Sequence, residues 1–107
     1  MHIVIIPAWY QASEEGHVGI FVRDIAENYA LAGHQVSVIC FHIDKDNTEK
    51  TIKTDCKGFV EYYHYVNKRR QIRKKALLYF EQYVLLNGQP DIINTHGLSA
   101  LGWVKKI

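Results

Sequence analysis

The chain has 107 residues, a formal net charge of +2 at pH 7 and 48% hydrophobic residues. This length predicts one small domain or a piece of a larger protein, and the composition excludes a disordered tail. No apolar run approaches the roughly 18 residues of a membrane-spanning helix, and the charge is too small to indicate nucleic acid. Cys40 and Cys56 have no close spacing and no signal peptide precedes them, which favours reduced thiols in the cytoplasm.

The first forty residues predict a strand, a helix and a second strand. Residues 2–6 are short and β-branched, which favours a central parallel strand that the following proline ends. A polar loop leads to Gly19, and the helix that begins next ends near Gly33, where a left-handed conformation costs glycine little. Residues 35–41 predict the second strand. The helix between these two strands is expected to have one apolar face, formed by Phe21, Ile25, Tyr29 and Ala32.

The second half of the chain predicts a loop, a strand, a helix and a short strand. Residues 42–58 are polar, lysine-rich and without period, which indicates a loop, whereas residues 59–66 are aromatic and β-branched and predict a strand. Residues 68–86 predict a helix that Gly88 and Pro90 end. Residues 91–94 predict a fourth strand. The inner face of the helix is expected to hold Ile72, Ala76, Phe80, Tyr83 and either Leu86 or Asn87.

This alternation predicts an α/β fold, a Rossmann-like open parallel sheet with helices on both faces and four strands in the order 3-2-1-4. Residues 97–106 predict the start of another helix, and its apolar stripe has no terminating cap. We therefore expect residues 1–107 to be an incomplete, truncated domain. A naturally short protein that ends in an uncapped helix is the alternative.

Gly19 and His96 are the candidate ligand-binding residues. A glycine at the start of the first helix lets an anion approach the positive end of the helix dipole, although it can equally serve the turn alone. His96 follows the fourth strand, at the edge where open α/β sheets bind ligands, so both residues are expected to face one crevice. A structural or merely exposed histidine is the alternative. No dinucleotide fingerprint and no metal-ligand spacing is present, so neither a nicotinamide cofactor nor a metal is expected.

Six of the eight residues from 68 to 75 are basic: Lys68, Arg69, Arg70, Arg73, Lys74 and Lys75. Cations in the first turn of a helix oppose its dipole, so local stability does not explain them. An anionic partner would explain these cations, whether that partner is phospholipid head groups, a lipid phosphate or nucleic acid. We expect the first five to contact an anionic acceptor or surface and expect no nucleic-acid partner. A solvated charged face is the alternative.

Several segments resemble the amino-terminal domain of family-four glycosyltransferases: residues 3–10, 19–23 and 32–39, in this order and spacing. Residues 90–97, followed by Gly102 and Trp103, are similar to the later strand of that family and its histidine. The resemblance spans nearly the whole chain. Two positions depart from the family pattern. The family often has two adjacent glycines where this chain has Val18 and Gly19, and often has a histidine where Asn94 stands.

The resemblance implies a retaining transferase of the hexosyltransferase type, with two Rossmann-like domains in the GT-B arrangement, acting in polysaccharide or glycolipid assembly. Residues 1–107 would be part of its amino-terminal, acceptor-side domain, without the nucleotide-sugar domain and its paired glutamates. Gly19 matches the glycine beside the donor diphosphate, and His96 matches the catalytic histidine near the transferred sugar. The implied partners are a nucleotide sugar and a glycan or glycolipid acceptor. The implied location is cytoplasmic, with peripheral contact to the inner face of the membrane.

The chain alone is expected to be inactive, because retaining transfer needs groups from both sides of a cleft. The alternative function is a non-catalytic Rossmann-like module that binds an anionic ligand through Gly19 and the basic segment. A response-regulator-like domain is disfavoured, since Pro7 and Ala8 stand where it needs acidic residues. An exposed half-cleft would also favour a homodimer of the fragment.

Overall fold

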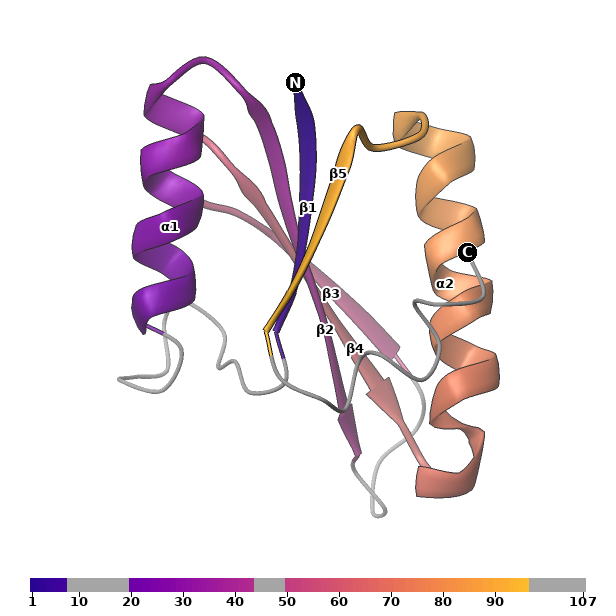
Figure 1. Ribbon diagram of the computed structural model, residues 1–107. Coiled ribbons are helices and arrows are strands. Elements are labelled where there is room, and N and C mark those ends of the chain that lie inside the picture. The colour runs from indigo at the N-terminus through magenta and orange to yellow at the C-terminus, as the bar shows by residue number, and fades with distance from the viewer. Residues whose placement is uncertain (8–19, 44–49, 97–107) are drawn as a thin grey trace.

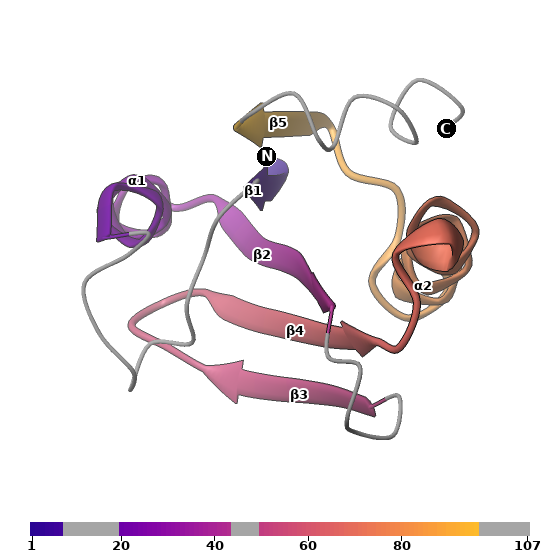
Figure 2. The ribbon, with the colours of Figure 1, turned by 90° about the horizontal axis from the view of Figure 1, so that it is seen from below.

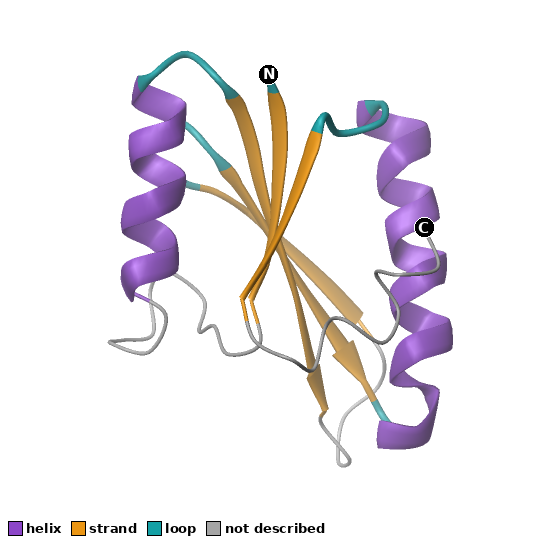
Figure 3. Cartoon of the chain, in the orientation of Figure 1, coloured by secondary structure: helices purple, strands orange, loops and turns teal. Residues whose placement is uncertain are grey.

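The computed structural model describes residues 1–7, 20–43 and 50–96 (Figure 1). Within these residues, strands and helices alternate along most of the chain, and a short 3-10 turn at Arg69–Gln71 precedes the second helix (Figure 3). The elements are β1 His2–Pro7, α1 Ile20–Leu31, β2 Gln35–Ile43, β3 Lys50–Asp55, β4 Val60–Val66, α2 Ile72–Asn87 and β5 Ile92–His96. The predicted helix in residues 97–106 lies outside the described residues.

The described strands form one sheet in the order β3-β4-β2-β1-β5. β1 is parallel to both β2 and β5, and β2 is parallel to β4, whereas β3 is antiparallel to β4. Parallel strands cannot be joined by a tight hairpin, and here α1 lies between β1 and β2, β3 between β2 and β4, and α2 between β4 and β5. Without β3 the order is the predicted 3-2-1-4, and the open Rossmann-like α/β sheet is confirmed.

The prediction of a loop over residues 42–58 is wrong, because this segment contains the end of β2 and the whole of β3. β3 is an edge strand with no helix to cover it, so it lacks the apolar alternation that signals a strand. Its lysines lie over aromatic rings of β4 instead. The amine of Lys50 is 5.0 Å from the ring centroid of Tyr65, and that of Lys53 is 5.9 Å from that of Tyr62. Lysines on an edge strand also oppose its pairing with another chain.

Each face of the sheet is covered by one helix, as predicted (Figure 2). Ile3 and Ile5 of β1 pack in the cluster beneath α1, and Val4 and Ile6 pack in the cluster beneath α2. All six residues of β1 are buried. A strand that is covered on both faces reads as a continuous apolar run, which explains why the sequence identifies β1 so readily.

The buried face of α1 is centred one residue away from the predicted one. Val22 and Ala26 are the buried residues, and Ala26 is 0% exposed because its small side chain lets the helix lie close to the sheet. Of the predicted residues, Ile25 and Tyr29 are half-buried, Ala32 lies beyond the helix and is exposed, and the side chain of Phe21 lies outside the described residues.

α2 buries the face that the sequence predicts. Leu86 is exposed and Asn87 is half-buried, so Asn87 is the one that continues this face. The helix ends at Gly88, whose φ of 85° lies in the left-handed region that favours glycine. The buried residues of α2 are Ala76, Phe80 and Tyr83.

A buried hydrogen-bonded chain joins β1, β2 and α2. The Tyr83 hydroxyl lies 2.5 Å from Nε2 of His2 and donates to Oγ of Ser37 at 2.7 Å. The carboxylate of Asp91 accepts the backbone N–H of His2 at 2.8 Å, which ties the segment before β5 to β1. Burial raises the pKa of Tyr83, so its hydroxyl stays protonated at neutral pH. These hydrogen bonds hold together the amino-terminal edge of the sheet, opposite the predicted ligand site.

Candidate functional site

The order of the strands reverses between β1 and β5. The chain leaves β1 through α1 to reach β2 on one side, and β5 lies on the other side of β1 after the crossover through α2 (Figure 1). Open α/β sheets bind their ligands at the carboxyl ends of the strands beside such a reversal. The candidate site therefore lies where β1 and β5 end.

His96 is the last residue of β5 and pairs in register with Pro7, the last residue of β1. Its backbone thus lies at the carboxyl edge beside the reversal. The side chain of His96 is not described, and Gly19 lies outside the described residues. The crevice that the two residues are predicted to share therefore stays a prediction.

The basic segment begins at the same edge of the sheet, because β4 ends at Val66 and the chain then turns into α2. β2 and β1 separate β4 from β5. Three strand spacings give about 14 Å between the ends of β4 and β5. The basic residues and His96 therefore share an edge without forming one cluster.

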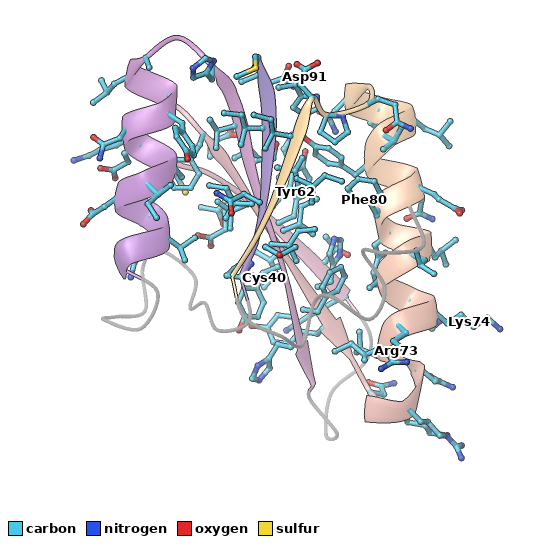
Figure 4. All side chains as sticks on the ribbon, viewed as in Figure 1. Cys40, Tyr62, Arg73, Lys74, Phe80 and Asp91 are labelled. Carbon is cyan, nitrogen blue, oxygen red and sulfur yellow. The ribbon has the colours of Figure 1, made fainter. Side chains whose placement is uncertain are left out.

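The cations of this segment face solvent. Lys68, Arg70, Arg73 and Lys74 are exposed, Lys75 is half-buried, and the side chain of Arg69 is not described. The first turn of α2 has no acidic residue, and Gln71 at its N-cap makes no capping side-chain hydrogen bond. In Figure 4, Lys74 points away from the sheet, whereas Phe80 on the same helix points toward it. The start of α2 therefore combines a positive helix end with positive side chains.

An aromatic cluster that the sequence does not predict packs against the middle of α2. The ring of His64 stacks on that of Tyr79 with centroids 4.2 Å apart, and Phe41 stacks on His64 at 5.2 Å. Nδ1 of His64 lies 2.7 Å from Oγ1 of Thr51. Burial lowers the pKa of His64 to about 4, so the imidazole is neutral at pH 7. His64 holds β3, β4 and α2 together, and its burial keeps it from acting on a ligand.

Glu61 is the second buried ionisable residue that the sequence does not predict. It lies in β4 and is 1% exposed. Burial, and next the negative charge of Glu61, raise the pKa of the Cys40 thiol. Cys40 is therefore a protonated thiol packed in the core. The thiol of Cys56 is half-buried and donates to the backbone oxygen of Thr54 at 3.7 Å.

Two open hollows among the described residues lie away from the reversal between β1 and β5. One of about 330 Å³ is lined by residues that include Gln35, Ser37 and Asn87, at the opposite edge of the sheet. The other, of about 420 Å³, is lined by Arg23 of α1 and by residues around Cys56. Within the described ranges, no three His, Cys, Asp or Glu side chains come together as a metal site. No helix in that part of the chain could cross a bilayer.

Comparison with known proteins gives one match. The family model described as Glycosyltransferase Family 4 matches residues 18–106, which is most of the chain and includes both Gly19 and His96. No curated protein and no solved structure matches the chain.

Proposed function

This chain belongs to glycosyltransferase family 4, and on that premise we propose that it is the acceptor-side half of a retaining glycosyltransferase. The whole enzyme would move a hexose from a nucleotide-sugar donor to a glycan or lipid-linked acceptor in the cytoplasm. The observation that carries the proposal is the family match over residues 18–106. It agrees with a sheet whose strand order reverses where β5 ends in His96.

The proposal assigns roles by position. The backbone at Gly19 would approach the donor diphosphate, and His96 would contact the transferred sugar or the acceptor hydroxyl. The basic residues would contact an anionic acceptor or surface: Lys68, Arg69, Arg70, Arg73 and Lys74. The donor is a substrate and no further cofactor is needed. The chain alone would be inactive, because stabilising charge at the reacting centre needs groups held on both sides of a cleft.

The test compares two histidines of the same sheet edge in the full-length protein. His96→Ala is expected to lower kcat at least about a hundredfold, the usual contribution of a positioned acid–base or polar group. His42→Ala is the matched control, because His42 is exposed near the end of β2. It should leave transfer from a panel of nucleotide sugars unchanged. Full activity of His96→Ala would contradict the assigned role.

The exposed cations at the start of α2 favour a second candidate function, a non-catalytic Rossmann-like module for an anionic ligand. Isothermal titration of the isolated chain with nucleotide sugars separates the two candidates. Half of a transferase cleft should bind them weakly. Saturable, stoichiometric binding by the isolated chain would favour the binding module.

A further inference from the structure

We propose that the hollow at the amino-terminal edge of the sheet binds a neutral sugar. This hollow, of about 330 Å³, is the one that Gln35, Ser37 and Asn87 help to line, and we name it the amino-edge hollow. It lies at the opposite edge from His96, and the six residues of β1 separate the two edges by about 20 Å. The proposal goes beyond the transfer reaction, because binding of a sugar here needs neither a nucleotide-sugar donor nor catalysis.

The amino-edge hollow exists because the sheet is wider than the helix that covers this face. The buried cluster beneath α2 takes its residues from β1, β2 and α2 itself, whereas β3 is mostly exposed. Strand pairing brings Ser37 of β2, Val60 of β4 and Asp55 of β3 into one row, and paired residues point to the same face. Lys53 and Tyr62 form the next row. Tyr62 packs against the cluster beneath α2, so both rows lie on the face that α2 covers in part (Figure 4).

The polar groups that line the hollow have hydrogen-bonding capacity left for a ligand. Ser37 is 4% exposed, and its Oγ accepts the proton of the Tyr83 hydroxyl, so among the described residues its own hydroxyl proton is left to be donated. Asn87 donates one N–H to the backbone oxygen of Tyr83 at 3.1 Å, which leaves its second N–H and its side-chain oxygen. Gln35 adds a second, exposed amide. The lining therefore offers both donors and acceptors.

The charged groups of the hollow select a ligand without net charge. Lys53 and Asp55 are both exposed and lie two residues apart on one face of β3, about 7 Å from each other. Asp55 opposes an anion and Lys53 opposes a cation. Hydroxyl groups suit both, because they accept from the ammonium and donate to the carboxylate. A phosphorylated ligand or a metal cation therefore fits this pair poorly.

A sugar ring meets both requirements. Each of its hydroxyls donates and accepts, which suits the amides, the serine and the charged pair. Its C–H faces are apolar and can pack on the half-buried side chains of Val60 and Tyr62. The volume of about 330 Å³ is at the lower end of the range of small-molecule sites, about 300 to 1,000 Å³, and suits a small saccharide. A zwitterion such as a free amino acid is the other class without net charge, and the experiment separates the two.

In a glycosyltransferase, the amino-edge hollow would hold a glycan away from the reacting centre. This role rests on the proposed function, whereas the binding itself does not. A glycan bound at the amino-terminal edge would keep the protein on that chain while another part of the chain enters the carboxyl edge.

The experiment is saturation-transfer NMR on the full-length protein without any nucleotide-sugar donor. The probes are maltose, lactose and methyl α-mannoside as neutral sugars, glucose 6-phosphate as an anionic sugar, and glutamine as a zwitterion. We expect saturation transfer to the ring C–H protons of at least one neutral sugar. We expect none to glucose 6-phosphate or glutamine at the same concentration.

Matched variants locate the bound sugar. Gln35→Ala/Asp55→Ala removes an amide and a carboxylate from the hollow and should weaken binding at least about fivefold, the effect of losing two hydrogen bonds. Asp24→Ala/Gln82→Ala removes the same two groups from exposed positions of α1 and α2 and should bind like the unaltered protein. His96→Ala should also leave this binding unchanged, because His96 lies at the other edge. Circular dichroism melts check that each variant folds.

Three results would overturn the proposal. The first is no saturation transfer to any of the three neutral sugars, and the second is saturation transfer to glutamine in preference to them. The third is unchanged binding in Gln35→Ala/Asp55→Ala, or a loss confined to His96→Ala, which would place the sugar outside the amino-edge hollow. None of these results alters the kcat expected for His96→Ala, so the failure of this proposal and that of the proposed function are distinguishable.

Discussion

The burial of His64 predicts that acid destabilises the fold. The pKa of its imidazole falls from 6.5 to about 4 because the ring is buried against Tyr79 and Phe41. The unfolded chain therefore binds a proton between pH 6.5 and 4 that the folded chain does not. The free energy of unfolding rises with pH through this window, so the contribution is complete above pH 6.5 and lost below pH 4. The difference between the pKa of 6.5 in the unfolded chain and about 4 in the folded chain corresponds to about 3 kcal/mol.

Urea unfolding at a series of pH values from 7 to 4, followed by far-ultraviolet circular dichroism, measures this effect. His64→Phe keeps an aromatic ring against Tyr79 and removes the titrating group. At pH 7 this variant should have a free energy of unfolding about 1 kcal/mol lower than that of the unaltered chain, because the bond to Thr51 is lost. Between pH 7 and pH 4.5 the variant should lose less of its free energy of unfolding than the unaltered chain does. His42→Gln, at an exposed position, controls for the loss of a histidine. Identical pH dependence in His64→Phe and the unaltered chain would refute the reasoning.

Three further predictions concern the stability and reactivity of the core. Tyr83→Phe removes the hydroxyl that joins His2 to Ser37 and should lower the free energy of unfolding by about 1 to 3 kcal/mol; an unchanged urea midpoint would contradict this. Cys40 should resist iodoacetamide in the folded chain and react after unfolding, as mass spectrometry can show, and fast native labelling would disprove its burial. Gly58→Ala should cost about 1 kcal/mol or more in urea, because φ is 78° and a new Cβ would lie 3.0 Å from that of Ala30; equal or greater stability would exclude this strain.

The sequence predicts the central part of the sheet well, because burial on both faces requires apolar residues at consecutive positions and this run is visible in the local sequence. β1 is an unbroken apolar run, and the positive φ at Gly33 and Gly88 marks the ends of both helices. The edge strand β3 has no such apolar run. It depends on contacts with β4, which lies later in the chain, so its own residues resemble a polar loop.

The residues of the candidate site and its surroundings were also predicted only in part. The position of His96 follows from strand order, and strand order follows from the alternation of strands and helices. His64 and Glu61 were missed because a polar residue in an aromatic strand is usually exposed. Their burial depends on α2, β3 and α1, which the sequence of β4 does not reveal. The two-residue period of a strand was the available signal, since it places His64 on the same face as Tyr62.

We propose above that this chain is one half of a glycosyltransferase. The most direct measurement is the length of the full reading frame, confirmed by the intact mass of the native protein. If the chain is half of such an enzyme, the product has about 350 to 400 residues, two to three domains of typical size, with a second glycine-rich Rossmann-like half. A native product of 107 residues would contradict it and would favour the binding module.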